Sequence, residues 1–269
     1  MLREEVVVRV PVRIDFAGGW TDVHYFSAAE GGAVLNAAIN HLVEGRASWS
    51  EGRLHVEYGL ELPSGSGLGT SGALDVAWLA LTNQIIGRAQ SQVDLAEGAY
   101  KLEKLLGVEG GKQDQYAATL GGFNLLRFRA EADPAEVEPL HVRPGVLRAL
   151  EESSVLCYSG SSHDSSSVHE LVWERYREGD QRTIQALRSI RDSVQSGRDA
   201  LLKGDLPALA EVLSHNREMA RALHPALVTE RMDELFAAGK GAGAMGAKAC
   251  GAGGGGCLYF LCQPDRSKA

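Results

Sequence analysis

The residues best suited to chemistry lie in a glycine-rich loop that leads into a helix. Residues 63–71 read Pro-Ser-Gly-Ser-Gly-Leu-Gly-Thr-Ser, with glycine at every second position in the middle. Glycine permits backbone conformations that turn several N–H groups toward one point. The apolar, breaker-free segment 73–86 predicts a helix that ends at Gly87, and its N-terminus adds partial positive charge. This combination predicts a cradle for phosphate oxygens and is favoured over a flexible linker.

The loop is not a Walker A loop, because no Gly-Lys-Ser/Thr follows it. A nucleotide bound here therefore needs a cation, a magnesium ligand and a base from elsewhere in the chain. A second glycine-rich stretch, 239–256, contains the pattern G-x-G-x-x-G twice. It precedes the strand-like run 257–262 instead of following a strand, which disfavours a dinucleotide-binding fingerprint.

Charged residues near the expected ends of elements are candidates for the missing groups. Arg13 lies on a strand that runs into the turn Gly18-Gly19, close to Thr21 and Asp22. Taken alone, an arginine at this position has an equally ordinary interpretation as a solvated strand residue.

Two carboxylates follow later in the chain. Ser91 predicts the start of a helix on which Glu103 lies against an apolar stripe, and Asp114 follows the turn Gly110-Gly111. Asp114 is either a base held among polar neighbours or an ordinary helix-start residue, and Glu103 is either directed inward or paired with a nearby lysine.

The remaining pattern alternates strands with helices. Residues 6–10, 11–16 and 54–58 read as strands, and 33–39 as a strand or turn. The polar segment 129–145 reads as a connection, 155–158 as a short strand and 159–167 as a polar loop. Helical patterns run over residues 167–238, with breaks at Gly179, Gly204 and Pro225, before the last strand at 257–262.

Composition excludes several classes of protein. The 269 residues are 44% hydrophobic and carry a net charge of −8, so the chain has no basic footprint for nucleic acid and no run long enough to span a membrane. The N-terminus does not read as a signal peptide, and four cysteines without a CxxC pair indicate reduced thiols and the cytoplasm. The histidines show no metal-binding spacing, and His163 and His169 read as surface or capping residues.

Three segments together resemble the motifs of the GHMP kinases, the superfamily that includes galactokinase and mevalonate kinase. These segments are 11–22, 63–71 and 246–256, in the family's order and approximate spacing. The residues within these motifs are most similar to those of heptose 7-phosphate kinases and the kinase domain of fucokinases. Relative to the family pattern, the chain is short between residues 58 and 63 and after Gly256.

The resemblance implies an α+β fold in two domains. Residues 1–145 would form an N-terminal domain like domain 2 of ribosomal protein S5, which binds ATP. Residues 146–269 would form a ferredoxin-like C-terminal domain, with the active site between the two.

The resemblance also implies roles for individual residues. Asp114 matches the catalytic base and Arg13 the basic residue beside the reacting oxygens, while Ser71 and Glu103 match the Mg²⁺ ligands. The residues matched to the nucleotide site are Gly65, Ser66, Gly67, Leu68, Gly69, Thr70 and Ser71. Those matched to the sugar site are Gly19, Thr21, Asp22, Gly122 and Gly253.

The function implied is an ATP- and Mg²⁺-dependent kinase that phosphorylates the anomeric hydroxyl of a sugar, first of all D-glycero-D-manno-heptose 7-phosphate. The alternatives are a fucose-, galactose- or mannose-type 1-kinase and a sugar or nucleotide sensor without catalysis. A heptose phosphate needs cations for its second phosphate, and Lys112, Arg175 and Lys248 are the candidates. The expected partner is a small sugar or sugar phosphate, with neither nucleic acid nor membrane, and either a monomer or a homodimer fits.

Overall fold

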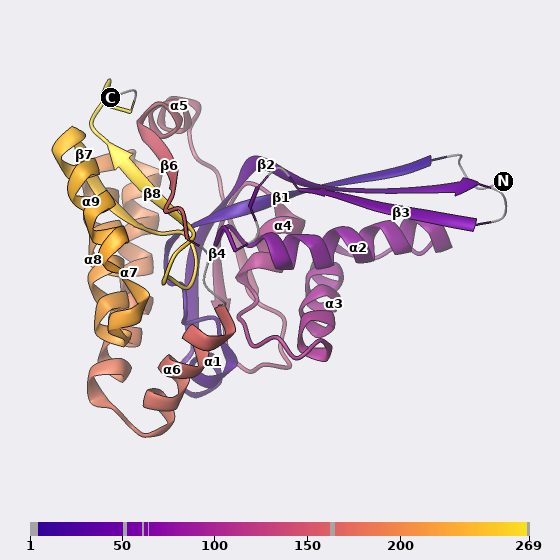
Figure 1. Cartoon of the computed structure of the whole chain (residues 1–269), viewed down its shortest axis with the longest axis horizontal. Helices are drawn as coiled ribbons and strands as arrows, with labels where there is room; N and C mark the ends of the chain where they lie inside the picture. Colours follow the sequence, from indigo (N-terminus) through magenta and orange to yellow (C-terminus); the bar gives the residue numbers. More distant parts are fainter. Residues whose placement is uncertain (1–4, 51–52, 61, 64, 162–164, 268–269) are drawn as a thin grey trace.

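The computed structural model describes residues 5–50, 53–60, 62–63, 65–161 and 165–267, with only the backbone of 165–167. Two antiparallel sheets and their helices form an α+β structure in which three strands extend to one side as a long ribbon (Figure 1). In this part of the chain, no helix combines the length and the apolar character needed to cross a membrane.

The first sheet holds five strands of the N-terminal half. They are β1 (Glu5–Ala17), β2 (Gly32–Ser50), β3 (Arg53–Leu60), β4 (Phe123–Phe128) and β5 (Glu136–Leu140). The order is β1-β2-β4-β5, and β3 pairs with the far half of β2. The long β2 extends well beyond the predicted 33–39, because it serves three neighbouring strands along its length.

Two sequence-based expectations for these strands need correction. The predicted strands 6–10 and 11–16 are one strand whose register shifts between Pro11 and Arg13. The segment 129–145 is more than a connection, since it contributes β5 at the edge of the sheet. Pro139 fits there because an edge strand has one side without a ladder partner.

The helices of this half are α1 (His24–Glu30), α2 (Thr70–Ile86), α3 (Gln92–Leu105) and α4 (Gln113–Leu120). Gly87 ends α2 in the left-handed conformation, and Ser91 caps α3 by accepting a hydrogen bond from the backbone N–H of Asp94, both as predicted. The start of α2 lies at Thr70, three residues before the predicted 73, so the helix begins within the glycine-rich motif itself.

The second sheet has strand order β6-β8-β7, from β6 (Ser154–Tyr158), β7 (Ala244–Ala249) and β8 (Cys257–Cys262). Its helices are α5 (Pro144–Ser153), α6 (Ser165–Arg177), α7 (Gln181–Lys203), α8 (Leu206–Leu223) and α9 (Glu230–Ala242), with the 3-10 turn η1 (Pro225–Leu227). The predicted breaks at Gly179, Gly204 and Pro225 are confirmed, whereas α5 was not foreseen.

The glycine-rich stretch 239–256 is only partly a loop. The end of α9 and all of β7 lie within it, and residues 250–256 remain as the connection to β8. A Cβ atom at Gly246 would lie 2.0 Å from the carbonyl oxygen of Ala210 on α8. Small residues are therefore needed in β7 because the helix packs directly on its backbone.

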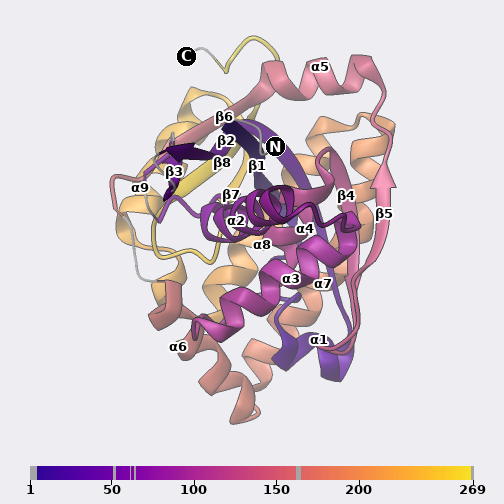
Figure 2. The ribbon, with the colours of Figure 1, turned by 90° about the vertical axis from the view of Figure 1, so that its right-hand side faces the viewer.

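Helices cover both faces of the first sheet, with α2, α3 and α4 on one side and α7 and α8 on the other (Figures 1 and 2). Val34 packs in a cluster with Ala96 and Tyr116, whereas the next residue, Leu35, packs with Leu201. Successive side chains of a strand point to opposite faces, so the pair Val34 and Leu35 anchors both helical layers.

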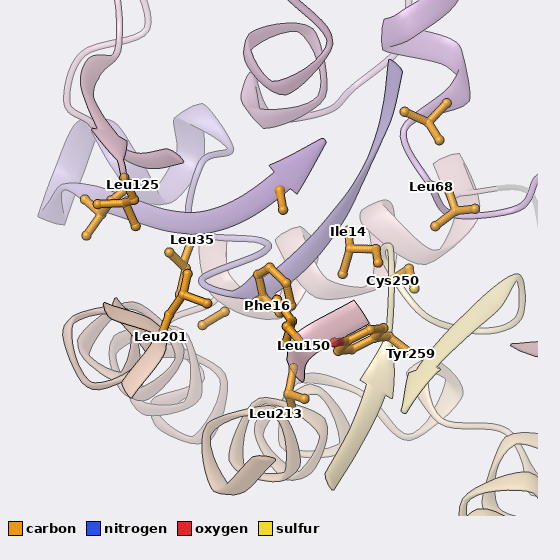
Figure 3. Close-up of a cluster of buried hydrophobic side chains, with 14 of the residues drawn as sticks. Ile14, Phe16, Leu35, Leu68, Leu125, Leu150, Leu201, Leu213, Cys250 and Tyr259 are labelled. Atoms are coloured by element: carbon orange, nitrogen blue, oxygen red, sulfur yellow. The ribbon is translucent and has the colours of Figure 1, made fainter. Parts of the chain in front are cut away.

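One hydrophobic core joins the two sheets (Figure 3). Phe16 of β1 stacks on Phe123 at 6.3 Å and meets the ring of Tyr259 of β8 edge-on at 5.5 Å. The segments around the first and third sequence motifs are thus fixed relative to each other. The division of the chain at residue 145 stays a prediction.

Candidate functional site

A cavity of about 530 Å³ lies where the three motif segments meet. Its walls come from residues 13–23, 60–74, 103–114 and 251–255, together with His169. We call it the central cavity. It contains most of the residues that the sequence singled out, although they come from distant parts of the chain.

The glycine-rich loop has a repeating geometry. Gly65, Gly67 and Gly69 all have positive φ, between 70° and 74°, and Gly69 is the N-cap of α2. All three line the cavity, as do Thr70 and Ser71 at the start of the helix. The unpaired N–H groups of a helix N-terminus therefore lie at the cavity wall, where they favour an anion.

The residues between the glycines anchor the loop instead of lining the cavity. The carbonyl oxygen of Ser66 accepts a hydrogen bond from the backbone N–H of Cys257 at 2.7 Å, and that of Leu68 accepts one from Arg13 at 2.9 Å. Both side chains are fully buried. Ser66 and Leu68 were predicted as nucleotide contacts, but they do not line the cavity; their carbonyl oxygens fix the loop to β8 and β1.

The third-motif loop packs against this loop so closely that only glycine fits. A Cβ atom at Gly251 would lie 2.8 Å from the carbonyl oxygen of Gly67 in that loop. On its other neighbour, η1, the same segment is equally tight, since a Cβ atom at Gly253 would lie 2.4 Å from the carbonyl oxygen of Leu227. Gly253 lines the central cavity as predicted.

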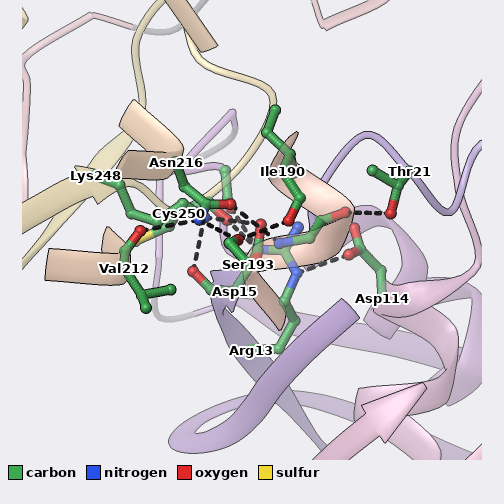
Figure 4. A network of polar contacts seen from close by, with 12 residues as sticks. Arg13, Asp15, Thr21, Asp114, Ile190, Ser193, Val212, Asn216, Lys248 and Cys250 are labelled. Carbon is green, nitrogen blue, oxygen red and sulfur yellow. Dashed lines mark hydrogen bonds and ion pairs between the residues drawn. The ribbon is translucent and has the colours of Figure 1, made fainter. Parts of the chain in front are cut away.

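Arg13 and Asp114 form an ion pair at the centre of the site (Figure 4). The Nε atom of Arg13 donates to Oδ1 of Asp114 at 2.7 Å, and Nη1 donates to the carbonyl oxygens of Gly67 and Cys250, also at 2.7 Å. Burial alone would lower the pKa of Arg13, but the charges of Asp114 and Asp15 raise it. Arg13 thereby joins all three motifs and keeps its charge.

Asp114 is oriented with one oxygen free. The residue is the second of α4, and its side chain is 27% exposed in the cavity. Across the described ranges its Oδ2 atom accepts no hydrogen bond. A Cβ atom at Gly69 would lie 3.0 Å from Cγ of Asp114, so the glycine lets the carboxylate reach the phosphate loop.

Glu103 and Ser71 lie together, as the resemblance implied. Burial, followed by the negative charges of Asp114 and Asp75, raises the pKa of Glu103 to about 7, although hydrogen bonds from Gln115 and the Ser71 hydroxyl act in the opposite direction. The Gln115 amide donates to Oε2 of Glu103 at 2.5 Å. A carboxylate buried beside other carboxylates is the environment that a divalent cation relieves.

No group of three His, Cys, Asp or Glu side chains within the described ranges could hold a metal by itself. Ser71 and Glu103 fit Mg²⁺ in the way nucleotide enzymes use it, with one or two protein oxygens completed by phosphates and water.

Asp22 is a third carboxylate near Asp114. Its Oδ2 atom accepts a hydrogen bond from the backbone N–H of Gln113 at 3.1 Å, and burial together with the charges of Asp114 and Asp15 raises its pKa to about 7. A Cβ atom at Gly111 would lie 1.8 Å from this oxygen. The turn Gly110-Gly111 therefore makes room for Asp22 as well as starting α4.

Trp20 and His169 form an aromatic wall that the sequence analysis missed. Trp20 has a φ of 80°, and its ring centroid lies 4.6 Å from that of His169. Both line the cavity, so the surface or capping role predicted for His169 is wrong. Burial lowers its pKa to about 4, which leaves the ring neutral at pH 7. His163 lies outside the described residues.

Gly19 lines the cavity as predicted, but the predicted sugar contacts Thr21 and Gly122 do not. Thr21 is fully buried, and its hydroxyl lies within hydrogen-bond distance of the carbonyl oxygens of Gly18 and Ala33. The carbonyl oxygen of Gly122 accepts from the backbone N–H of Ala38. These two residues support the turn and the sheet behind the site.

The three cations expected to bind a second phosphate have other partners. Lys112 is buried against Glu97 at 2.9 Å, Arg175 donates to the carbonyl oxygen of Leu223 at 3.1 Å, and Lys248 donates to Asp15 at 2.8 Å. None of them lines the central cavity. Lys248 and Arg217 border an adjoining cavity of about 30 Å³, which shares Asp15, Gly19, Trp20 and residues 251–253 with the central cavity.

Comparison with known proteins assigns the chain to a family. The model described as "GHMP kinases N terminal domain" matches residues 33–122, and the one described as "GHMP kinases C terminal" matches residues 198–269. Together they cover more than half of the chain.

Individual relatives support the same family assignment. The chain is 24% identical to a D-glycero-alpha-D-manno-heptose 7-phosphate kinase of Campylobacter jejuni, over 96% of this chain and 89% of that protein. It is 26% identical to the bifunctional fucokinase/GDP-fucose pyrophosphorylase of Arabidopsis thaliana, over 97% of this chain but 30% of that longer protein. The crystal structure of a D-glycero-D-manno-heptose 1-phosphate kinase from Bacteriodes thetaiotaomicron superposes with a TM-score of 0.75 at 26% identity, covering 97% and 90% of the two chains.

The alignment with the Campylobacter protein extends over 306 positions, more than the 269 residues of this chain. This chain therefore lacks residues that its relative has at internal positions, in keeping with the short segment before the glycine-rich loop.

Proposed function

Because the chain belongs to the GHMP kinases, phosphotransferases with an alcohol group as acceptor, we propose that it transfers the γ-phosphoryl group of ATP to a sugar hydroxyl in the central cavity. The observation that carries this proposal is the Arg13–Asp114 pair. It holds a carboxylate with one free oxygen beside the N-terminus of α2, where phosphates are expected.

In this proposal the glycine-rich loop binds the nucleotide phosphates. The backbone N–H groups of the cavity-lining residues of this loop and the partial positive charge of α2 offset the phosphate charge without a lysine. The adjacent wall is lined by Leu60, Leu62 and Pro63, which offer apolar surface to the base of the nucleotide.

Asp114 then accepts the proton of the attacking hydroxyl on its free Oδ2 atom. Arg13 fixes the carboxylate through Oδ1 and keeps a positive charge beside the oxygens of the transferred group. Rigid positioning of this pair by the carbonyl groups of Gly67 and Cys250 supplies the orientation that phosphoryl transfer requires.

Ser71 and Glu103 would hold Mg²⁺. The ion, when bound, neutralises charge on the β- and γ-phosphate oxygens. Glu103 must be ionised to serve as a ligand, and the amide of Gln115 fixes its orientation for that purpose.

The acceptor atom is the anomeric hydroxyl of a sugar. Resemblance puts D-glycero-D-manno-heptose 7-phosphate first, on the strength of the Campylobacter relative, and the fucokinase relative supports fucose, galactose or mannose as alternatives. A sensor without catalysis would have no use for a complete set of Arg13, Ser71, Glu103 and Asp114, so the kinase is favoured.

The cytoplasm remains the expected compartment. The four cysteines, at positions 157, 250, 257 and 262, are all free thiols in the structure. Free thiols are typical of a reducing compartment.

The proposal is tested by measuring ADP release from Mg-ATP with heptose 7-phosphate, fucose, galactose, mannose and mevalonate, for the wild type and for Asp114→Asn. We expect turnover with at least one sugar and its loss in the variant. ATP binding without turnover of any sugar would reject the kinase and favour the sensor.

A further inference from the structure

We propose that the acceptor is an uncharged sugar and that the site discriminates against sugar phosphates. This inference rests on the proposed kinase function and concerns the acceptor side of the central cavity, formed by Asp15, Trp20, Asp22, Glu109 and His169. It departs from the heptose phosphate that resemblance placed first.

The first argument is a shortage of positive charge. Arg13 is the one lysine or arginine among the described residues that line the central cavity. Its Nε and Nη1 atoms are bound to Asp114, Gly67 and Cys250, which leaves Nη2 for the transferred phosphoryl group. His169, with its pKa lowered by burial to about 4, adds no charge at pH 7.

Three described cations near the cavity are paired with protein carboxylates, and one of them, Arg217 of the adjoining small cavity, is paired with Glu218 at 3.2 Å. Lys248 is paired with Asp15 at 2.8 Å, and Lys104 is paired with Glu109 at 2.9 Å. Even with these two pairs counted as neutral, Asp22 has no cationic partner in the described part of the chain. Within the described part of the chain, the acceptor side therefore has no unpaired cation to offer a second phosphate.

The second argument is the presence of negative charge. A phosphate brought near Asp114, or near the ionised form of Asp22, meets like charges in a partly buried site, where water screens them weakly. Burial raises the pKa of Asp22 most, but the neighbouring Asp114 and Asp15 raise it as well, which reports a negative potential in this part of the cavity. The same carboxylates are good acceptors for sugar hydroxyls.

The third argument is the character of the remaining wall. Trp20 and His169 present ring surfaces, and Val23 and Val108 add apolar side chains. Oδ1 of Asp15 is buried without a hydrogen-bond partner among the described residues. Apolar ring surface beside unpaired acceptor oxygens suits a compact polyol, whose C–H faces pack on rings and whose hydroxyls donate.

The decisive experiment compares acceptors that differ only by a phosphate: mannose and mannose 6-phosphate, galactose and galactose 6-phosphate, and the heptose with and without its 7-phosphate. We expect kcat/KM, from ADP release with Mg-ATP, to be at least about 100-fold higher for the uncharged member of the productive pair. A preference for the phosphorylated member would overturn the inference and leave the kinase in place. Absence of turnover with both members of every pair would reject the proposed function itself.

A variant of Asp22 tests whether this carboxylate causes the discrimination against sugar phosphates. Asp22→Asn keeps the shape of the side chain but removes its charge, so the KM of the uncharged sugar should rise about tenfold while the discrimination against its phosphate falls. Asp265→Asn, an equivalent change on the exposed surface, is the matched control. Unchanged KM values for both sugars in Asp22→Asn would show that this carboxylate does not face the acceptor, and would count against the inference.

Discussion

The two sides of the central cavity are built by different means. The nucleotide side is mostly backbone, with glycines at 65, 67 and 69 and the first turn of α2. The proposed acceptor side is made of side chains from three separated segments, with Asp22, Trp20 and His169 as its main members. A triphosphate can be recognised by N–H groups in many sequences, whereas a particular acceptor needs specific side chains placed by the fold.

Asp114 belongs to both sides, so its replacement should have the largest effect. Asp114→Asn removes the proton acceptor while keeping the bond to Arg13, and should lower kcat by about 10²- to 10⁴-fold. ATP affinity, measured by calorimetry, should remain within a few-fold of wild type. A comparable loss of ATP affinity would mean that Asp114 serves the nucleotide side alone.

Gly67→Ala tests the backbone side separately. The residue has a φ of 73°, and an added Cβ would lie 3.4 Å from the backbone nitrogen of Gly251, so the main cost is a strained loop. We expect the KM for ATP to rise about tenfold with the KM for the sugar unchanged. Gly87→Ala, with a φ of 69° and open space around it, is the matched control, and should lower stability without changing either KM. Equal rises in both KM values for Gly67→Ala would contradict the division into two sides.

Glu103→Gln tests the proposed metal ligand on the nucleotide side. Removing the charge beside Asp114 and Asp75 should raise the Mg²⁺ concentration needed for half-maximal activity about tenfold. The rise in melting temperature that Mg-ATP gives the wild type should also shrink. An unchanged magnesium dependence would exclude Glu103 as a ligand.

The pH dependence of stability should reveal the ionisation of Asp22 on the proposed acceptor side. Burial raises the pKa of Asp22 to about 7 in the folded protein, so the folded state binds a proton that the unfolded state has already lost. Its contribution to stability is present in full below the unfolded pKa and falls as the pH rises through 7.

Between pH 6.5 and 8 this group should reduce the free energy of unfolding by about 1 kcal/mol. His169 has the opposite effect, but at pH values below 6.5, because burial lowers its pKa to about 4. Thermal unfolding of the wild type and Asp22→Asn at both pH values measures the difference. Parallel curves for the two proteins would mean that Asp22 is ionised normally.

The sequence by itself determined the glycine-rich loop and, through the resemblance, the groups proposed to react. The loop 63–71 lies next to its helix along the chain, so local rules for glycine and helix ends were enough to predict it. Resemblance then identified Arg13 and Asp114, which the fold brings into direct contact across 101 positions of sequence.

Only the tertiary structure decided the acceptor side. Thr21 and Asp22 are neighbours in sequence, yet one is turned into the fold and the other lines the cavity. Lys112, one of three candidates for binding a second phosphate, is two residues before Asp114 but is buried against Glu97. Trp20 and His169 come from distant segments and carry no motif that would have linked them. The direction of each side chain depends on packing between segments, and that information lies in the assembled core, beyond the reach of local sequence patterns.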